Sequence, residues 1–197
     1  MSVTEGEPTP RETLVDRVKS LLTKPSATWD RIEAEPATVA GLYRNYIAWL
    51  ALVSPLAFAI GSVVFQHGPV LSALVAAAVL YLFWLVGAFV VALMIAAVAP
   101  RFGGDNNRIQ AMKVAAYAFT PSMLSGVFAI FPPLAVLGVL GFYSFYLLWA
   151  GLPKLMKVSE QRRLGFYAAV LVLMLAIGMA SGFLIAPLLA VDRLTPR

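Results

Sequence analysis

The chain has 197 residues, a formal net charge of +5 and no cysteine, and 60% of its residues are hydrophobic while 13% are charged. A soluble domain cannot hide that much apolar surface, because polar residues must cover its outside. The absence of cysteine excludes disulfides and thiolate chemistry. The basic residues are scattered around apolar segments rather than gathered with aromatics on one face, so no nucleic-acid partner is expected.

The first 41 residues are polar enough to lie outside a membrane. Residues 1–8 are predicted to be a disordered tail, and residues 9–41 to form one or two amphipathic cytoplasmic helices. Thr9, Pro10 and Glu12 have the spacing of a capping box with proline at the first helical position. We therefore expect the first helix to begin there.

Basic and aromatic side chains near these helices are candidate contacts with the membrane. Arg17 and Lys19 accompany an apolar helical face, as in helices that rest on a leaflet, although the same face could pack on the protein's own loops. Trp29 suits an interface because its ring is apolar while its N–H needs a partner. We expect Arg17, Lys19 and Trp29, with Lys154 and Lys157 further along the chain, to contact the interface or lipid.

Five apolar segments reach the roughly 20 residues that cross a bilayer. They are residues 42–65, 70–99, 109–131, 134–152 and 164–190. The expected fold is an all-α integral membrane protein with a five-helix transmembrane bundle over residues 42–190, followed by a periplasmic tail at 191–197. Lys113, near the start of the third span, is expected to snorkel to the headgroups. Pro153 is expected to begin a basic loop after the fourth span.

The distribution of lysine and arginine predicts the orientation. Thirteen of the fifteen fall in the N-terminal segment, around the turn after the second span, or in the loop after the fourth span. The other two, Arg193 and Arg197, follow the last span. By the positive-inside rule the N-terminus is cytoplasmic and the C-terminus periplasmic. The sequence thus predicts a multi-pass protein of a bacterial inner membrane.

Two stripes of small residues lie at four-residue spacing in the second and fifth spans. Small side chains let neighbouring backbones approach closely in a membrane, so both stripes are candidate helix-packing faces. They consist of Ala88, Ala92 and Ala96, and of Gly178, Gly182 and Ala186. Self-association through these faces, or contact with another membrane protein, is expected.

A proline in the middle of the third span is the clearest candidate for a cavity. Pro121 is flanked by Thr120 and Ser122, whose hydroxyls can satisfy the carbonyl that a proline frees. The kink could be packed, or it could open a polar pocket, with Tyr117 nearby on the same span. Two tyrosines near the end of the fourth span, Tyr143 and Tyr146, could line that cavity or form an aromatic face against neighbours.

Chemistry within the membrane finds little support in the sequence. The interiors of the spans contain no Asp, Glu or Arg, which disfavours a transporter coupled to protons or sodium through buried carboxylates. No nucleophile and base can be paired, so an enzyme is not expected. No metal site or cofactor is expected either.

The order of several short motifs resembles the Yip1 family in its bacterial form. The motifs are Pro25-Ser26-Ala27-Thr28-Trp29, Phe102-Gly103-Gly104, Ala116-Tyr117-Ala118-Phe119-Thr120-Pro121, Pro132-Pro133, Gly141-Phe142-Tyr143-Ser144-Phe145-Tyr146 and Gly151-Leu152-Pro153-Lys154-Leu155-Met156. The resemblance implies a five-helix membrane bundle with a cytoplasmic N-terminus. Eukaryotic relatives bind small GTPases and act in vesicle traffic and membrane shaping. Their Asp-Leu-Tyr-Gly-Pro motif is absent here, which argues against a partner of the Rab type.

Two functions follow as hypotheses. The first is a non-enzymatic inner-membrane protein that acts through contacts with lipids or membrane proteins, in membrane organisation or assembly. The second is a small-molecule transporter or lipid-translocating protein with a path near the Pro121 kink. Scrambling of lipids by the reconstituted protein would favour the second.

Overall fold

A computed structural model describes residues 12–190 of the chain, with side chains as far as residue 180. The elements in chain order are α1 (Leu14–Thr23), α2 (Pro25–Ala34), α3 (Val39–Leu42), η1 (Tyr43–Ile47), α4 (Ala48–Leu50), α5 (Val53–Val64), α6 (Val70–Val98), η2 (Ala99–Phe102), α7 (Arg108–Ala118), α8 (Thr120–Ser125), η3 (Gly126–Ile130), η4 (Pro132–Phe142), α9 (Tyr143–Met156) and α10 (Glu160–Ala190). No strand occurs within this described part of the chain. The predicted tails, 1–8 and 191–197, lie outside it.

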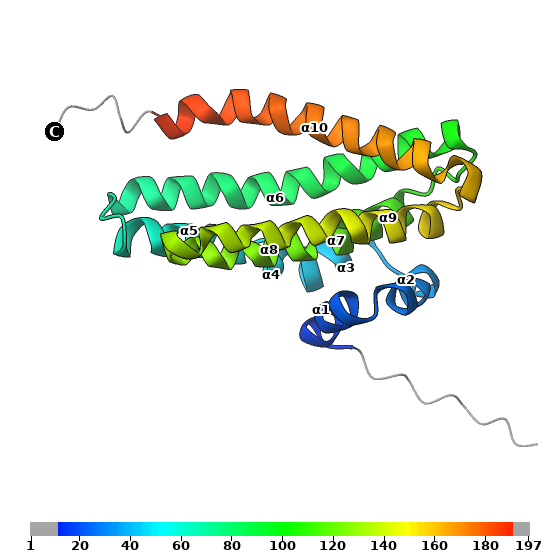
Figure 1. The fold of residues 1–197 in the computed structure, drawn as a ribbon, viewed down its shortest axis with the longest axis horizontal. Helices are drawn as coiled ribbons and strands as arrows, with labels where there is room; N and C mark the ends of the chain where they lie inside the picture. The colour runs from blue at the N-terminus through cyan, green and yellow to red at the C-terminus, as the bar shows by residue number, and fades with distance from the viewer. Residues whose placement is uncertain (1–11, 191–197) are drawn as a thin grey trace, which may run out of the picture.

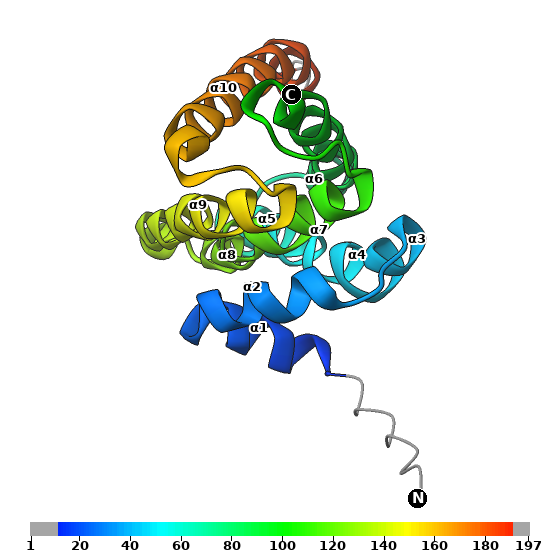
Figure 2. The same cartoon turned by 90° about the vertical axis from the view of Figure 1, so that its right-hand side faces the viewer.

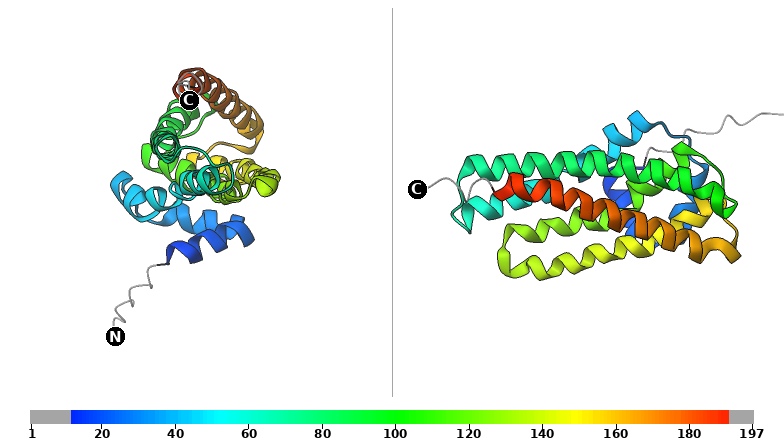
Figure 3. Two further views of the ribbon diagram at one scale, coloured as in Figure 1. Left: turned by 90° about the vertical axis from the view of Figure 1, so that its left-hand side faces the viewer. Right: turned by 90° about the horizontal axis from the view of Figure 1, so that it is seen from above.

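Within residues 12–190, five helical segments are long and apolar enough to cross a membrane, which confirms the predicted five-helix fold. They cover Val39–Val64, Val70–Phe102, Arg108–Ile130, Pro132–Met156 and Glu160–Ala180. The segments run lengthwise beside one another (Figure 1). In the end-on view, α1 and α2 lie against one side of the bundle and α10 lies on the opposite side (Figure 2). Figure 3 shows the same elongated bundle from two further directions.

The first helix begins later than the capping-box pattern predicts. Thr13 is its N-cap, and its hydroxyl oxygen accepts from the backbone N–H of Asp16 at 3.2 Å. Of the three residues in the predicted box, Glu12 is not helical, while Thr9 and Pro10 lie outside the described residues. Thr13 satisfies the helix terminus instead, because threonine is a favoured N-cap residue and its side chain accepts from a backbone N–H of the first turn.

Prolines divide the third span. Pro121 is the second residue of α8, which follows a break at Phe119, because the proline ring opposes the preceding turn and has no N–H to donate. The hydroxyl of Thr120 donates to the freed carbonyl of Tyr117 at 2.8 Å. Beyond α8 the chain tightens into the 3₁₀ helix η3, and after Phe131 the residues Pro132 and Pro133 begin η4.

The fourth span is longer than predicted at both ends. Its first 11 residues form the 3₁₀ helix η4, and its last 14 form α9. Because a 3₁₀ helix rises ~2.0 Å per residue and an α-helix ~1.5 Å, these 25 residues extend ~43 Å, as far as the 29-residue helix α6. The predicted loop from Pro153 shrinks to residues 157–159.

The helix continues through Pro153 because the carbonyl that this proline frees has another partner. Four residues earlier, the carbonyl of Trp149 accepts from Nη2 of Arg163 at 3.2 Å. The guanidinium of Arg163 also lies 4.2 Å from the centroid of the Trp149 ring. Arg163 therefore supplies the hydrogen bond that the proline removes, and the prediction of a loop starting at Pro153 is wrong.

Two turns meet at one end of the bundle, which we call the basic end. Its basic residues are Arg101, Arg108, Lys154, Lys157, Arg162 and Arg163. The N–H of Asp105 donates to the carbonyl of Met156 at 2.8 Å and joins the two turns. Gly103 has a φ of +74°, a left-handed conformation that a side chain disfavours. The opposite, uncharged end contains residues 65–69 and Phe131.

Candidate functional site

The helix pair α1–α2 is locked onto the basic end of the bundle. Trp29 is completely buried, and a Cβ on Gly151 would come within 2.7 Å of its ring. Only glycine at position 151 lets α9 approach the indole this closely. The Trp29 side chain therefore packs against the bundle and is not exposed at the interface position that the sequence suggests.

Lys113 fastens the end of α2 to the third span. Its ammonium group donates to the carbonyls of Ile32 at 2.7 Å, Glu33 at 3.3 Å and Glu35 at 2.5 Å. A cation at this position also complements the negative end of the α2 dipole. The residue is 2% exposed, so the predicted snorkelling does not occur. Lys113 is used within the protein.

A cluster of charges ties α1 to the segment after α2. Nη2 of Arg17 donates to both carboxylate oxygens of Glu35, at 2.7 and 2.8 Å, and lies 3.1 Å from Glu12. Burial opposes the charge on Arg17, but Glu35, Tyr117 and Glu12 outweigh it, so its pKa lies above the ordinary value. Its guanidinium also lies 5.6 Å from the centroid of the Tyr117 ring.

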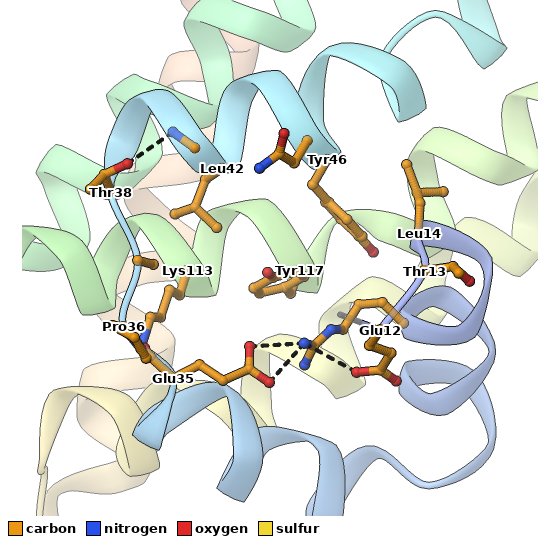
Figure 4. Close-up of a pocket in the computed structure, with 14 residues that line it drawn as sticks. Glu12, Thr13, Leu14, Glu35, Pro36, Thr38, Leu42, Tyr46, Lys113 and Tyr117 are labelled. Atoms are coloured by element: carbon orange, nitrogen blue, oxygen red, sulfur yellow. Dashed lines mark hydrogen bonds and ion pairs between the residues drawn. The ribbon is translucent and has the colours of Figure 1, made fainter. Parts of the chain in front are cut away.

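These groups line a polar pocket of about 420 Å³ between α1 and the first and third spans. In Figure 4, Glu12 and Glu35 converge on the same guanidinium, with Lys113 and Tyr117 on the wall toward the bundle. Only 9% of Arg17 is exposed, so it is an internal tether rather than the lipid contact expected from sequence. The charges within the pocket balance one another.

The two lysines at the end of α9 also form contacts within the protein. Lys154 donates to Asp30 at 2.6 Å and to the Ser26 hydroxyl at 3.2 Å. Lys157 pairs with Glu33. Both hold α2 at the basic end. Of the five residues predicted to face lipid, Lys19 alone is exposed with no ion pair among the described residues.

Hydroxyl groups satisfy the backbone around the Pro121 kink. Tyr46 and Thr120 share a hydrogen bond of 2.6 Å, deep between the first and third spans. The backbone N–H of Ser122 donates to the Ser144 hydroxyl at 3.0 Å, and the two serine hydroxyls are 2.8 Å apart. These polar groups face one another inside the bundle, as the packed-kink alternative expects.

A pocket of about 520 Å³ nevertheless opens beside Pro121, and it is apolar rather than polar. We call it the Pro121 pocket. Its walls are Leu22, Val53, Pro121, Leu124, Ser125, Val127, Phe128, Leu140 and Tyr143. Tyr146 does not line it, but its ring contacts that of Tyr143 at a tilt of 40°, with centroids 5.3 Å apart. The hydroxyls of Thr120 and Ser122 do not face this pocket with free hydrogen-bonding groups, because they donate to the carbonyls of Tyr117 and Gly141.

Of the residues that line the Pro121 pocket, the sequence marks Pro121 and Tyr143 as candidates and gives no sign of the others. Leu22, Val53 and Leu140 come from three distant segments, and each is an ordinary leucine or valine in an apolar run. No local pattern marks them. Only the packing of α1 and α5 against the hairpin of η3 and η4 brings them together.

The two small-residue stripes have different surroundings. Ala88, Ala92 and Ala96 are buried in a core cluster that also contains residues 111–112 and 114–118 of α7. Gly178 faces open space, since nothing lies within 4 Å of a Cβ built on it. Gly182 and Ala186 belong to α10 but fall beyond the residues whose side chains are described.

As far as residue 180, where the described side chains end, the fully buried side chains of α10 lie near the basic end. Phe166 and Val170 are fully buried, whereas Val172, Leu175 and Met179 are 64%, 66% and 66% exposed. Apolar grooves of about 450 and 490 Å³ lie between α10 and its neighbours α6 and α9, and Gly178 lines both. Within the described residues, no three His, Asp or Glu side chains form a possible metal site.

The chain matches one family model and two curated relatives. A model described as the Yip1 domain matches residues 19–182. Over 170 residues the chain is 25% identical to "Inner membrane protein YohC" of Escherichia coli strain K12, covering 80% of this chain and 87% of that protein. YohC of Escherichia coli O6:H1 (strain CFT073) matches equally. No solved structure matches.

Proposed function

This chain belongs to the Yip1 domain family, and from that premise we propose that it is a non-enzymatic protein of a bacterial inner membrane. Its proposed role is membrane organisation or assembly through contacts with lipids or other membrane proteins. The name of the YohC relatives supports the inner-membrane location. The concentration of lysine and arginine at the basic end supports a cytoplasmic position for that end, with the C-terminus in the periplasm.

The observation that carries this proposal is the exposure of α10. A span that packs on its own bundle at one end and exposes apolar side chains along the next turns offers a surface to a partner helix or to lipid. Gly178 on that surface leaves room for a close approach of another backbone. Because the alanine stripe of α6 is buried within the chain, α10 is the better candidate for an intermolecular contact.

The contact can be tested by oxidative crosslinking, because the chain has no cysteine. In membranes, Met179→Cys should form disulfide-linked dimers if α10 meets a second copy, since Met179 is exposed. Adding Gly178→Leu should reduce dimers several-fold by holding the backbones apart. Gly138→Leu is the matched control, because Gly138 also has open space around its Cβ but lies on η4.

Undiminished dimers in the Gly178→Leu variant would argue against this face. Complete absence of crosslinks in the Met179→Cys parent would argue against self-association, and the contact would then be with lipid or with another protein. Loss of crosslinks in the Gly138→Leu control would mean that the parent contact is not specific to α10.

Lipid translocation is the second candidate, and the Pro121 pocket is the observation that favours it. The pocket is apolar and lies beside a kinked span. Reconstituted protein that exposes an inner-leaflet fluorescent lipid to dithionite faster than protein-free vesicles would support it. A rate equal to that of protein-free vesicles would exclude lipid translocation and would not affect the proposed contact through α10.

A further inference from the structure

The outer face of α1 has the character of a helix that lies at a membrane surface. Val15, Lys19 and Leu22 share this face, because they are spaced at i, i+4 and i+7. Val15 is 71% exposed and Leu22 is 40% exposed, although both are apolar. Apolar side chains interleaved with lysine and left uncovered by the protein suit the boundary between headgroups and acyl chains. The inner face, with Arg17 and Leu21, is buried on the bundle.

The same helix forms the rim of the Pro121 pocket. Leu22 lines the pocket together with residues of the spans, and the hydroxyl of Tyr143 donates to the carbonyl of Leu22 at 3.3 Å. From this rim the walls continue to Phe128 and Leu140, which belong to the uncharged hairpin of η3 and η4. The pocket therefore extends from α1, at the surface, to residues within the spans. The acyl chain of a phospholipid extends in the same way from its headgroup into the membrane.

Charge identifies the kind of headgroup. The other basic side chains packed around α1 and α2 are occupied: Arg17, Arg31, Lys154 and Lys157 pair with carboxylates, and Lys113 with carbonyls. Lys19 and Lys24 take part in none of the described ion pairs. The nearby carboxylate on α1, Asp16, accepts from the Thr13 hydroxyl. Two available ammonium groups beside an apolar pocket favour a lipid with a net negative charge.

We propose that the Pro121 pocket binds one acyl chain of an anionic phospholipid whose phosphate lies against Lys19 and Lys24. Leu22 lies one turn from Lys19, so a lipid that passes over Leu22 places its phosphate within reach of the lysine stems. The site is separate from α10. The inference rests on the lipid-contact part of the proposed function and names the lipid at the Pro121 pocket, and it can fail while the α10 contact stands.

Native mass spectrometry of the purified protein tests the proposal. Phosphatidylglycerol, which is anionic, and phosphatidylcholine, which is zwitterionic, are added in turn, and bound lipid is counted. Leu140→Trp fills the pocket and should lower occupancy by phosphatidylglycerol about tenfold. Val136→Trp is the matched control, because Val136 lies on the same 3₁₀ helix, is 74% exposed and does not line the pocket. It should bind as the parent does.

The headgroup is tested separately. Lys19→Glu should lower occupancy by phosphatidylglycerol at least about fivefold, the effect of one lysine near an anionic lipid, and leave phosphatidylcholine unchanged. Glycerophosphoglycerol, the same headgroup without acyl chains, should not compete. Gel filtration and circular dichroism establish whether each variant is folded. If Leu140→Trp is not folded, Val53→Phe replaces it, because Val53 also lines the pocket.

Four outcomes would overturn the proposal. Equal lipid binding by Leu140→Trp and Val136→Trp would show that the pocket holds no chain. Equal loss of both lipids in Lys19→Glu, or no loss, would remove the anionic preference. Competition by the chain-free headgroup would indicate a site for a soluble phosphodiester. A change in dimer population with no change in lipid would mean that a second copy occupies the pocket.

Discussion

A buried lysine, Lys113, is one of the residues that attach the α1–α2 pair to the membrane bundle. Composition suggests that Lys113, at the edge of an apolar span, reaches out to headgroups. Instead its three N–H bonds meet three carbonyls at the end of α2. A proline at position 36 prevents α2 from continuing as a helix, and the carbonyls left at its end need donors. The lysine supplies them.

Replacing this lysine should therefore release the helix pair. Lys113→Met keeps the length of the side chain but leaves buried carbonyls without donors, so we expect the free energy of unfolding to fall by about 3 kcal/mol. Denaturant titration in mixed micelles measures it. Faster proteolysis between residues 34 and 39 would show that the pair has detached.

The matched control for this change is Lys154→Met. Lys154 also bonds to α2, through Asp30, but the pair is largely exposed and should contribute less than about 1 kcal/mol. If the two variants lost equal stability, burial of the Lys113 ammonium would not be what holds α2. A stable Lys113→Met protein with an uncleaved linker would lead to the same conclusion.

At the scale of elements, the length of an uncharged apolar segment predicts a span well where a proline stands at each end of the segment. Helix α6 begins directly after Pro69 and ends just before Pro100, and the predicted range differs from the observed one by a single residue. Length alone places the spans because an apolar run of that size has no other stable environment. It does not show how the chain is wound within each span.

Prolines inside a span have effects that depend on distant residues. At Pro121 the helix breaks, and the freed carbonyl is satisfied by the adjacent Thr120. At Pro153 the helix continues, because Arg163 on another helix donates to the freed carbonyl. The first partner is visible in the sequence, and the second depends on how α9 and α10 pack. Hydropathy also gives no sign of the 3₁₀ winding of η4, which lets a shorter span reach as far as α6.

The Pro121 pocket, too, is formed partly by residues with a local sequence signal and partly by residues that only the packing of distant segments brings there. Pro121 and Tyr143 carry local signals, a proline within a span and an aromatic side chain, and a cavity is one of the two alternatives that the sequence offers for each. The character of the pocket is decided by which side chains turn toward it. The hydroxyls turn inward to one another, and leucines from α1 and η4 remain to line the opening.

At the scale of the whole molecule, the two sides of the bundle have different properties. On one side α1 and α2 are attached by ion pairs and by the buried Trp29, while on the other α10 is apolar and largely exposed (Figure 2). The two ends of the bundle differ as well: one is the basic end, and the other, at residues 65–69, has no Lys, Arg, Asp or Glu. This polarity gives the protein an expected orientation in the membrane.

The orientation can be tested with two single-cysteine variants, because the parent has no cysteine to react. Gln66→Cys and Asn106→Cys place thiols in exposed polar turns at opposite ends of the bundle. Arginine and lysine near membrane spans stay on the cytoplasmic side, so position 106, close to Arg101 and Arg108, should be cytoplasmic and position 66 periplasmic. A membrane-impermeant maleimide should label Gln66→Cys in intact spheroplasts and Asn106→Cys only after lysis. The reverse pattern would place α1 and α2 in the periplasm, and labelling of both in intact spheroplasts would mean that the charge asymmetry does not fix a single orientation.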